Sequence, residues 1–218
     1  YDMGVHLEAN HPEVINQEPL RGPNVYPNIE GWKVATEEYF DEMVDLAKIL
    51  LNAMSHAIGL PQNYFDHCLQ DSLCFLRLIH YPPTLDNTDS QGFKAGTHTD
   101  YGCVTILAQD EVGGLQVQDV NGNWIDAPPI PNTYVINIGD MMARWSNDLY
   151  KSTPHRVSSP KGKQRFSFPF FIQPSPKTII RCLPNCYNES NPPKYLPITS
   201  MEYLQSRFSA TYKHRAEV

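Results

Sequence analysis

The sequence lacks the features that mark membrane proteins and nucleic-acid-binding proteins. Its apolar stretches are all far too short to cross a bilayer. No run of basic residues occurs, and the formal net charge is -7, whereas a nucleic-acid partner favours a basic face. We therefore expect a soluble protein with no membrane association and no nucleic-acid partner.

The sequence has few cysteines, and their spacing does not match that of a disulfide framework. The odd number of cysteines favours free thiols, which predict a reducing compartment and a cytoplasmic location. The five are Cys68, Cys74, Cys103, Cys182 and Cys186. The last two could form a metal-binding pair, but a zinc site of that kind needs a second pair nearby, and the sequence offers none. Internal repeats and low-complexity tracts are also missing.

What is present fits one globular domain. The chain has 218 residues, of which 41% are hydrophobic and 11% aromatic, enough for one substantial core. It begins with Tyr1, without a signal peptide after it, which is compatible with a start inside a longer protein.

Two helices are predicted. Residues 31–58 carry apolar side chains at three- and four-residue steps, and Gly59 and Pro61 supply the stop. A C-terminal helix is predicted over residues 201–213, because Thr199 and Glu202 have the spacing of a capping box. Residues 1–28 have no regular pattern. We therefore divide the chain into an irregular lead with a scaffold helix (1–65), a central region (71–183) and a C-terminal helix (199–214).

The central region has the pattern of a β-protein. Asn121 and Gly122 separate a strand over residues 115–120 from one that begins at Trp124, a hairpin in which both turn positions need positive φ. Further strands are predicted over residues 73–81, 134–138, 155–157, 166–172 and 178–182. Short antiparallel strands in this number predict a mainly β fold, a jelly roll or related barrel, with flanking helices.

A candidate metal site lies at His98 and Asp100. Residues two apart in an extended segment point to the same side, so an imidazole nitrogen and a carboxylate oxygen can meet at one point. A second histidine from a distant strand would complete a facial triad with open positions, as iron(II) oxygen chemistry requires. The alternative for His98 is an ordinary histidine satisfied by a neighbour. That interpretation is kept for His6, His11, His56, His67 and His214.

A candidate anion site follows at Arg165 and Ser167, which also lie two apart on one predicted strand. A guanidinium beside a hydroxyl is a good receptor for a carboxylate. An arginine in an apolar strand needs an anion, since burying an unpaired charge is costly. The alternative is an internal salt bridge to an Asp or Glu.

Several sequence motifs include or flank the candidate metal and anion sites. They are LRLIHYPP at 76–83, HTDYG at 98–102, GGLQV at 113–117, NIGDMMARWSND at 137–148, STPHRV at 152–157 and RFSFPFF at 165–171. With them the chain resembles the 2-oxoglutarate and iron(II)-dependent oxygenases of the isopenicillin N synthase-like superfamily. The resemblance covers most of the chain from Leu73 to Pro174 and implies a double-stranded β-helix, a cupin-like jelly roll.

The resemblance also implies a ligand set and a reaction. Arg165 and Ser167 would bind the distal carboxylate of 2-oxoglutarate, and Tyr81 matches a tyrosine that contacts the same group. The reaction would use dioxygen to oxidise a C–H bond of a small organic substrate, by hydroxylation, desaturation or cyclisation. It would release succinate and carbon dioxide, with ascorbate in a supporting role. Iron(II) would be held by His98, Asp100 and His155.

One departure from the family concerns the N-terminal side. Members usually carry an additional N-terminal region of roughly a hundred residues, a size within ordinary domain limits, and no such region is found in this sequence. We expect that the chain omits this region or that this member is short. Substrate contacts from that region are not visible in the sequence.

Strand parity suggests substrate contacts. If Tyr81 faces the site, Arg77 points to the same side and could hold a polar or anionic substrate group; the alternative is a salt bridge on the barrel wall. Phe171 shares the parity of the anion site and would form an apolar wall, unless Pro169 introduces a bulge. Tyr101 would edge the pocket, with core packing as its alternative.

Three other functions compete with the oxygenase. An iron oxidase of the same superfamily would not use 2-oxoglutarate, and succinate formation would discriminate the two. A zinc hydrolase could use the same ligands, but it needs a base, and the motifs contain no second carboxylate. A catalytically silent jelly-roll module would be favoured if a metal ligand were missing. Outside these roles, Asp140 is expected to cap a turn and Trp145 to lie in the core.

Overall fold

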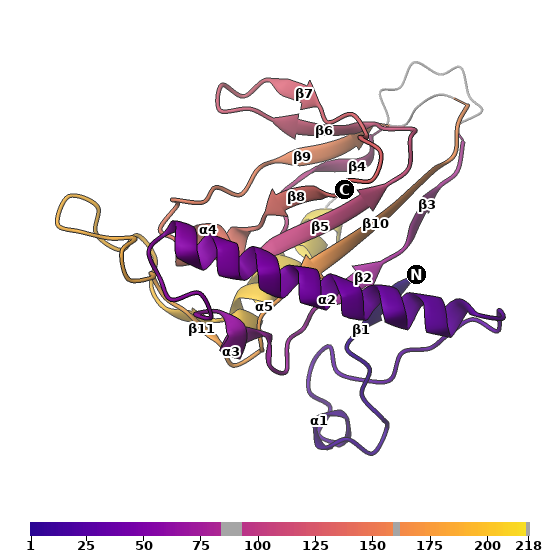
Figure 1. Ribbon diagram of the computed structural model, residues 1–218, viewed down its shortest axis with the longest axis horizontal. Coiled ribbons are helices and arrows are strands. Elements are labelled where there is room, and N and C mark those ends of the chain that lie inside the picture. Colours follow the sequence, from indigo (N-terminus) through magenta and orange to yellow (C-terminus); the bar gives the residue numbers. More distant parts are fainter. Residues whose placement is uncertain (84–92, 159–161, 217–218) are drawn as a thin grey trace.

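The computed structural model describes residues 1–83, 93–158 and 162–216. Its main strands form two antiparallel sheets (Figure 1). Side chains from both sheets line one cavity. The larger sheet has the order β1 (Asp2–Gly4), β2 (Phe75–Arg77), β10 (Arg165–Ile172), β5 (Val104–Gln109), β8 (Val135–Ile138), and β3 (Ile79–Tyr81) also pairs with β10. The smaller sheet has the order β4 (Phe93–His98), β9 (His155–Ser158), β6 (Leu115–Gln118), β7 (Trp124–Asp126). The mainly β fold predicted from the sequence is confirmed.

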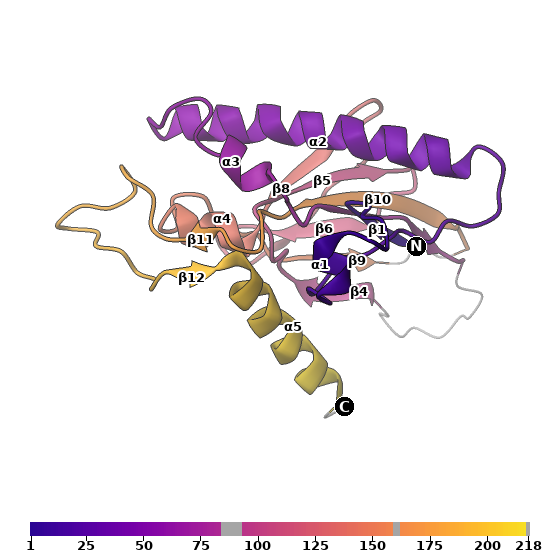
Figure 2. The same cartoon turned by 90° about the horizontal axis from the view of Figure 1, so that it is seen from below.

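Helices flank the sheets on two sides. The long helix α2 (Trp32–Ala57) runs across the larger sheet, and α5 (Ser200–Ala216) leaves the other side of the molecule (Figure 2). The remaining elements are short: α1 (Pro12–Ile15), α3 (Asp66–Leu69), α4 (Asp140–Trp145), and the paired strands β11 (Ile179–Ile180) and β12 (Ile198–Thr199). Within the described ranges, no helix is long and apolar enough to cross a membrane.

The core lies between α2 and strand β10. Helix α2 buries one stripe of side chains, among them Phe40 and Met43, and the ring of Phe40 meets that of Phe170 edge-on, with centroids 5.1 Å apart. Phe170 and Ile172 have no exposed surface. Because side chains alternate along a strand, the other face of β10 is left for the cavity.

Both predicted long helices are confirmed. Helix α2 begins after Gly31, which has a φ of 75°, in the left-handed region that favours glycine. At the start of α5, the Thr199 hydroxyl and backbone amide donate to Oε2 of Glu202 at 2.7 Å and 3.0 Å. The amide of Glu202 donates back to the Thr199 hydroxyl at 3.2 Å. This reciprocal pair is the capping box that the sequence predicts. Trp145 is buried in the core, as expected.

The predicted hairpin has a different turn. Of its two central residues, Gly122 has a positive φ, 84°, while Asn121 is not among the positive-φ residues. The carboxylate of Asp119 accepts hydrogen bonds from the amides of Asn121 and Asn123 at 2.8 Å and 2.7 Å. This side-chain turn ends the strand at Gln118, two residues earlier than predicted.

The expectation of an irregular lead is wrong at its start. Strand β1 pairs with β2, and Met3 is buried. A strand of three residues is too short to show alternation, so its sequence carries no signal. The single strand predicted over residues 73–81 is split at Leu78 into β2 and β3, and the Leu78 amide donates to the Tyr1 carbonyl at 2.8 Å.

The core contact on β10 gives a stability prediction. Replacing Phe170 with alanine should lower the free energy of unfolding by about 3–5 kcal/mol, because the side chain is fully buried and leaves a cavity. Phe166→Ala is the matched control, since Phe166 lies on the same strand and is 37% exposed. Urea unfolding measures both. Equal losses for the two variants would contradict this placement of the core.

Candidate metal centre

A cavity of about 380 Å³ lies between the two sheets. Most of its wall is apolar, with Leu107 and Val135 from the larger sheet and Leu115 and Val157 from the smaller one. The polar side chains that line it include each residue that the sequence predicts for the metal and carboxylate sites: His98, Asp100, His155, Arg165, Ser167 and Tyr81.

Three of these residues converge. His98 ends β4 and His155 begins β9, and the two are partners across the antiparallel pair, with ring centroids 4.3 Å apart. Asp100 follows two residues after His98, and its Oδ1 lies 3.6 Å from Nε2 of His155. One ligand atom from each residue lies within 4.8 Å of the others. This is the one group of at least three metal-ligating side chains found among the described residues.

Backbone carbonyls orient both imidazoles. Nδ1 of His98 donates to the Gly96 carbonyl at 2.7 Å, and Nδ1 of His155 donates to the Thr153 carbonyl at 3.0 Å. A proton on Nδ1 leaves Nε2 unprotonated in the neutral ring, which is the form that binds a metal. The pKa of His98 is lowered, first because surrounding protein displaces water from the ring. Although His98 as a residue is exposed, this partial loss of water around the ring favours the neutral ligand.

The carboxylate of Asp100 is also held on one side. Its Oδ2 accepts hydrogen bonds from the hydroxyl of Thr105 at 2.7 Å and from the amide of Asn137 at 2.6 Å. Asp100 is 6% exposed, so these two donors replace water that the charged group has lost. They leave Oδ1 directed at His155. Neither donor was among the residues singled out from the sequence.

Arg165 is a buried cation with incomplete pairing. It is 1% exposed, and its guanidinium donates from Nη2 to Gln109 at 3.2 Å, with the Tyr81 hydroxyl also facing it. Nε and Nη1 have no partner, and burial lowers the pKa of this group. The carboxylate of nearby Asp110 binds the Phe166 amide. The salt bridge considered as an alternative is therefore not found in the described part of the chain.

The neighbours of Arg165 lie where strand parity predicts. Tyr81 is its partner in register on β3, and the guanidinium lies 5.1 Å from the centre of the Tyr81 ring. Ser167 is buried on the same face. Phe171 also lines the cavity and stacks on Phe75 at 4.5 Å. The register between β10 and β5 is continuous through Pro169, so the bulge considered for it does not form.

Arg77 lies on the side that strand parity predicts, whereas Tyr101 does not line the cavity. Arg77 reaches the cavity, but its Nε and Nη2 bind the carboxylate of Asp2 at 2.7 Å and 2.8 Å. The salt bridge on the barrel wall, which was the alternative role considered for Arg77, is therefore present. Tyr101 is not among the described residues that line the cavity. Its hydroxyl bonds the hydroxyl of Thr211 at 2.6 Å, and its ring packs on Phe208 of α5.

Comparison with known proteins decides the family. Residues 63–174, just over half of the chain, match the family model described as the 2OG-Fe(II) oxygenase superfamily. The chain belongs to this superfamily. A 2-oxoglutarate-Fe(II) type oxidoreductase from Emericella nidulans is 36% identical to this superfamily member over 216 residues, which cover 96% of the chain and 62% of the relative.

Solved structures agree with the fold of this superfamily member. A full-length Neurospora crassa protein in complex with alpha-KG (2-oxoglutarate) superposes with a TM-score of 0.84 at 37% identity, covering 96% of this chain and 65% of its own. A 2OG-Fe(II) oxygenase family protein from Caulobacter crescentus gives 0.86 at 33% identity, with coverages of 97% and 68%. The chain spans about two thirds of these structures and 62% of the Emericella relative.

The hydrogen bonds on Asp100 give a metal-binding prediction. Thr105→Val keeps the shape of the side chain and removes the 2.7 Å donor to Oδ2. We expect the affinity for Co(II), an oxygen-stable substitute for iron(II), to fall about tenfold, since such supporting bonds orient ligands. Titration calorimetry measures it. Thr133→Val, which removes a surface hydroxyl bonded to the Ile130 carbonyl, is the control. Unchanged affinity in Thr105→Val would show that this bond does not orient Asp100.

Proposed function

We propose that this chain forms the catalytic domain of a non-haem iron(II), 2-oxoglutarate-dependent dioxygenase acting on a small organic substrate. The observation that supports this best is one cavity that holds both the converging side chains of His98, Asp100 and His155 and the incompletely paired guanidinium of Arg165. Substrate, 2-oxoglutarate and dioxygen would give oxidised substrate, succinate and carbon dioxide. For a hydroxylation, one oxygen atom enters the substrate and the other enters succinate.

The donor set fits iron(II). Two imidazoles and one carboxylate on one side of a metal leave the opposite positions for small molecules. When bound there, iron(II) supplies the activation of dioxygen that is coupled to decarboxylation of 2-oxoglutarate. A zinc hydrolase needs a further acid or base, and Asp100 is the only acidic residue among the described residues that line the cavity. The donor chemistry therefore favours the oxygenase.

The protein's own side chains would bind and orient the co-substrate. Nε and Nη1 of Arg165 have no hydrogen-bond partner among the described residues, and a carboxylate can accept from two guanidinium nitrogens at once. Ser167 and Tyr81 add hydroxyl groups on the same side of the cavity. We propose that these three residues hold the distal carboxylate of 2-oxoglutarate. The aliphatic wall excludes water around it, which strengthens each of these hydrogen bonds.

The substrate is proposed to be a small polar molecule. A volume of about 380 Å³ is at the small end for ligand pockets and must also hold the co-substrate. The Neurospora crassa neighbour was also solved with thymine and with 5-formyluracil, molecules of that size. We propose that Arg77 and Phe171 contact the substrate. Because Asp2 already balances the charge of Arg77, a polar group fits this end better than a strong anion.

The proposal also includes a cellular compartment and a supporting reductant. All five cysteines are free thiols, which supports a reducing compartment such as the cytoplasm. Ascorbate would support turnover by returning oxidised iron to iron(II).

The co-substrate site gives a spectroscopic prediction. Without oxygen, iron(II) and 2-oxoglutarate added together should produce a weak visible charge-transfer band that neither produces alone. Arg165→Ala should need at least about tenfold more 2-oxoglutarate, because hydrogen bonds to charged groups contribute about 1.5–3 kcal/mol each. Arg181→Ala, at an exposed arginine, is the control and should match the unaltered protein.

Each other outcome has a distinct meaning. If the metal binds but no band develops, an iron oxidase that does not use 2-oxoglutarate becomes the better proposal. If neither iron(II) nor Co(II) binds, the assignment of the three ligands is wrong.

Arg77 gives a kinetic prediction. After small amides and acids have been screened for faster succinate release, Arg77→Ala should raise the KM of the substrate found by roughly tenfold, the value of one charged hydrogen bond. Succinate release without substrate should stay within about twofold, because Arg77 is not placed at the co-substrate. Asp2→Asn breaks the ion pair but leaves the guanidinium. If Asp2→Asn and Arg77→Ala behave alike, Arg77 serves only the barrel wall.

A further inference from the structure

The segment that carries two of the metal ligands is not held by strand pairing at Asp100. Strand β4 ends at His98, and its pairing with β9 shifts register between Ala95 and His98. Asp100 therefore lies beyond the regular ladder of hydrogen bonds. Its position must be fixed by other contacts, because a ligand set needs its atoms held within a fraction of an ångström.

Helix α4 supplies further contacts to this segment, in addition to the two donors on the Asp100 carboxylate. The backbone amide of Asp140 donates to the Asp100 carbonyl at 2.8 Å. The hydroxyl of Thr99, the residue between the two ligands, donates to Oδ2 of Asp140 at 3.1 Å. The approach is close: a Cβ added at Gly139 would lie 2.3 Å from the Gly102 carbonyl oxygen. The first residue of α4 thus contacts the ligand segment through both its backbone and its side chain.

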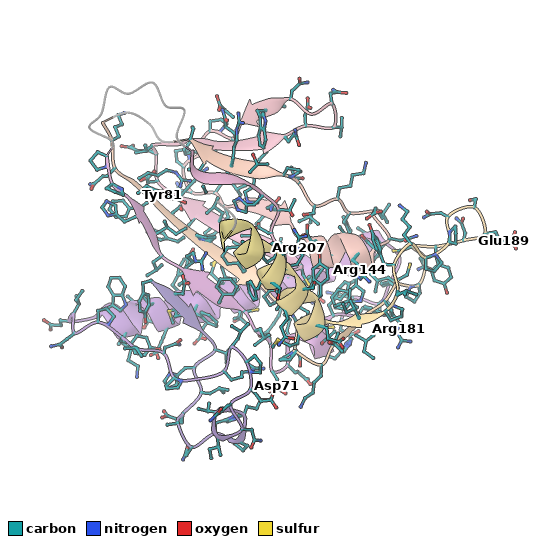
Figure 3. The ribbon with its side chains drawn as sticks, turned by 180° about the vertical axis from the view of Figure 1, so that it is seen from behind. Asp71, Tyr81, Arg144, Arg181, Glu189 and Arg207 are labelled. Atoms are coloured by element: carbon teal, nitrogen blue, oxygen red, sulfur yellow. The ribbon has the colours of Figure 1, made fainter. Side chains whose placement is uncertain are left out.

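The C-terminal helix α5 contacts the same carboxylate. Nε of Arg207 lies 3.5 Å from Oδ2 of Asp140, and its guanidinium lies 4.9 Å from the centre of the Tyr101 ring. Tyr101, directly after Asp100, is bonded to Thr211 of this helix. Figure 3 shows Arg207 on α5, which crosses the strands in that view. Asp140 therefore links α5 to the residue between the metal ligands.

We propose that Asp140 is a positioning residue of the metal centre, which holds the segment from His98 to Asp100 in its ligand geometry through Thr99. The inference rests on the proposed function for the identity of the metal ligands. It goes beyond that function because Asp140 lies outside the cavity lining among the described residues. It also replaces the expectation that Asp140 caps a turn: the partners of its carboxylate are the side chains of Thr99, Arg207 and Tyr203.

Asp140 positions Thr99 through the location of its carboxylate oxygen and not through its negative charge. The side chains of Arg207 and Asp140 are 39% and 15% exposed, and a partly exposed ion pair contributes little by itself. The hydroxyl of Tyr203 also faces the Asp140 carboxylate. An asparagine at position 140 keeps an oxygen acceptor for Thr99, whereas an alanine does not. The two substitutions therefore separate the hydrogen bond from the charge.

The test is a Co(II) titration of the full chain without 2-oxoglutarate, read from the visible d–d absorption of the bound metal. Asp140→Ala should raise the dissociation constant of Co(II) about tenfold and change the band shape, since bonds that orient ligands have effects of this size. Asp140→Asn should stay within about threefold. Thr99→Val combined with Asp140→Ala should bind no worse than Asp140→Ala, because the two substitutions remove one interaction.

The control separates positioning from stability. Asp148→Ala removes contacts to Lys194 and Tyr195, which lie with Asp140 around a surface pocket. It should lower the unfolding midpoint but leave the Co(II) spectrum unchanged. The inference is overturned if Asp140→Ala binds Co(II) within twofold of the unaltered protein, or if Asp148→Ala weakens binding equally. It is also overturned if the double variant binds Co(II) more weakly than Asp140→Ala.

Failure of the proposed function has a separate signature. The unaltered protein would bind Co(II), and its iron(II) form would show no change on addition of 2-oxoglutarate. In that case the role of Asp140 in metal binding would still be measured by the Co(II) titration alone.

Discussion

Strand β10 joins the core to the cavity, and the rest of the structure depends on how its side chains alternate. It pairs with β2, β3 and β5. Phe170 and Ile172 point into the core, while Arg165 and Ser167 point into the cavity. A slip of one residue would exchange the two faces and would place a guanidinium in the apolar core. Packing against α2 thus fixes the register that also directs the anion site.

The cavity holds a carboxylate with two hydrogen-bond donors and a guanidinium that lacks partners for some of its own donors. Asp100 has two hydrogen-bond donors on one oxygen, whereas Arg165 has two nitrogens without a partner among the described residues. A buried cation without its anion lowers the stability of the free protein. A carboxylate ligand that pairs with it would stabilise the folded state in proportion to its concentration and affinity. Stability and co-substrate binding are therefore coupled through one side chain.

Much of the fold and of the metal site could be predicted from the sequence because both rest on local signals. Period and capping identified α2 and α5. The His-x-Asp spacing identified His98 and Asp100 as candidates, and the resemblance to the oxygenase family added His155. Short or two-sided elements left no such signal: β5 (Val104–Gln109) begins with a buried run and lacks clear alternation, and β1 spans three residues. Thr105, Asn137 and Asp140 were missed as supports because their partners are set by tertiary packing. The roles of the site residues remain predictions.

The contact between Tyr101 and Thr211 joins residues separated by 110 positions. Because the chain is made from its N-terminus, Thr211 is added 110 positions after Tyr101. The strands of both main sheets and α2 all precede α5 in the sequence. The contacts that α5 makes with Tyr101 and Asp140 are therefore the last ones available to the segment between His98 and Asp100. During synthesis, a nascent chain could contain all three metal-binding side chains before the helix that completes their support has been made.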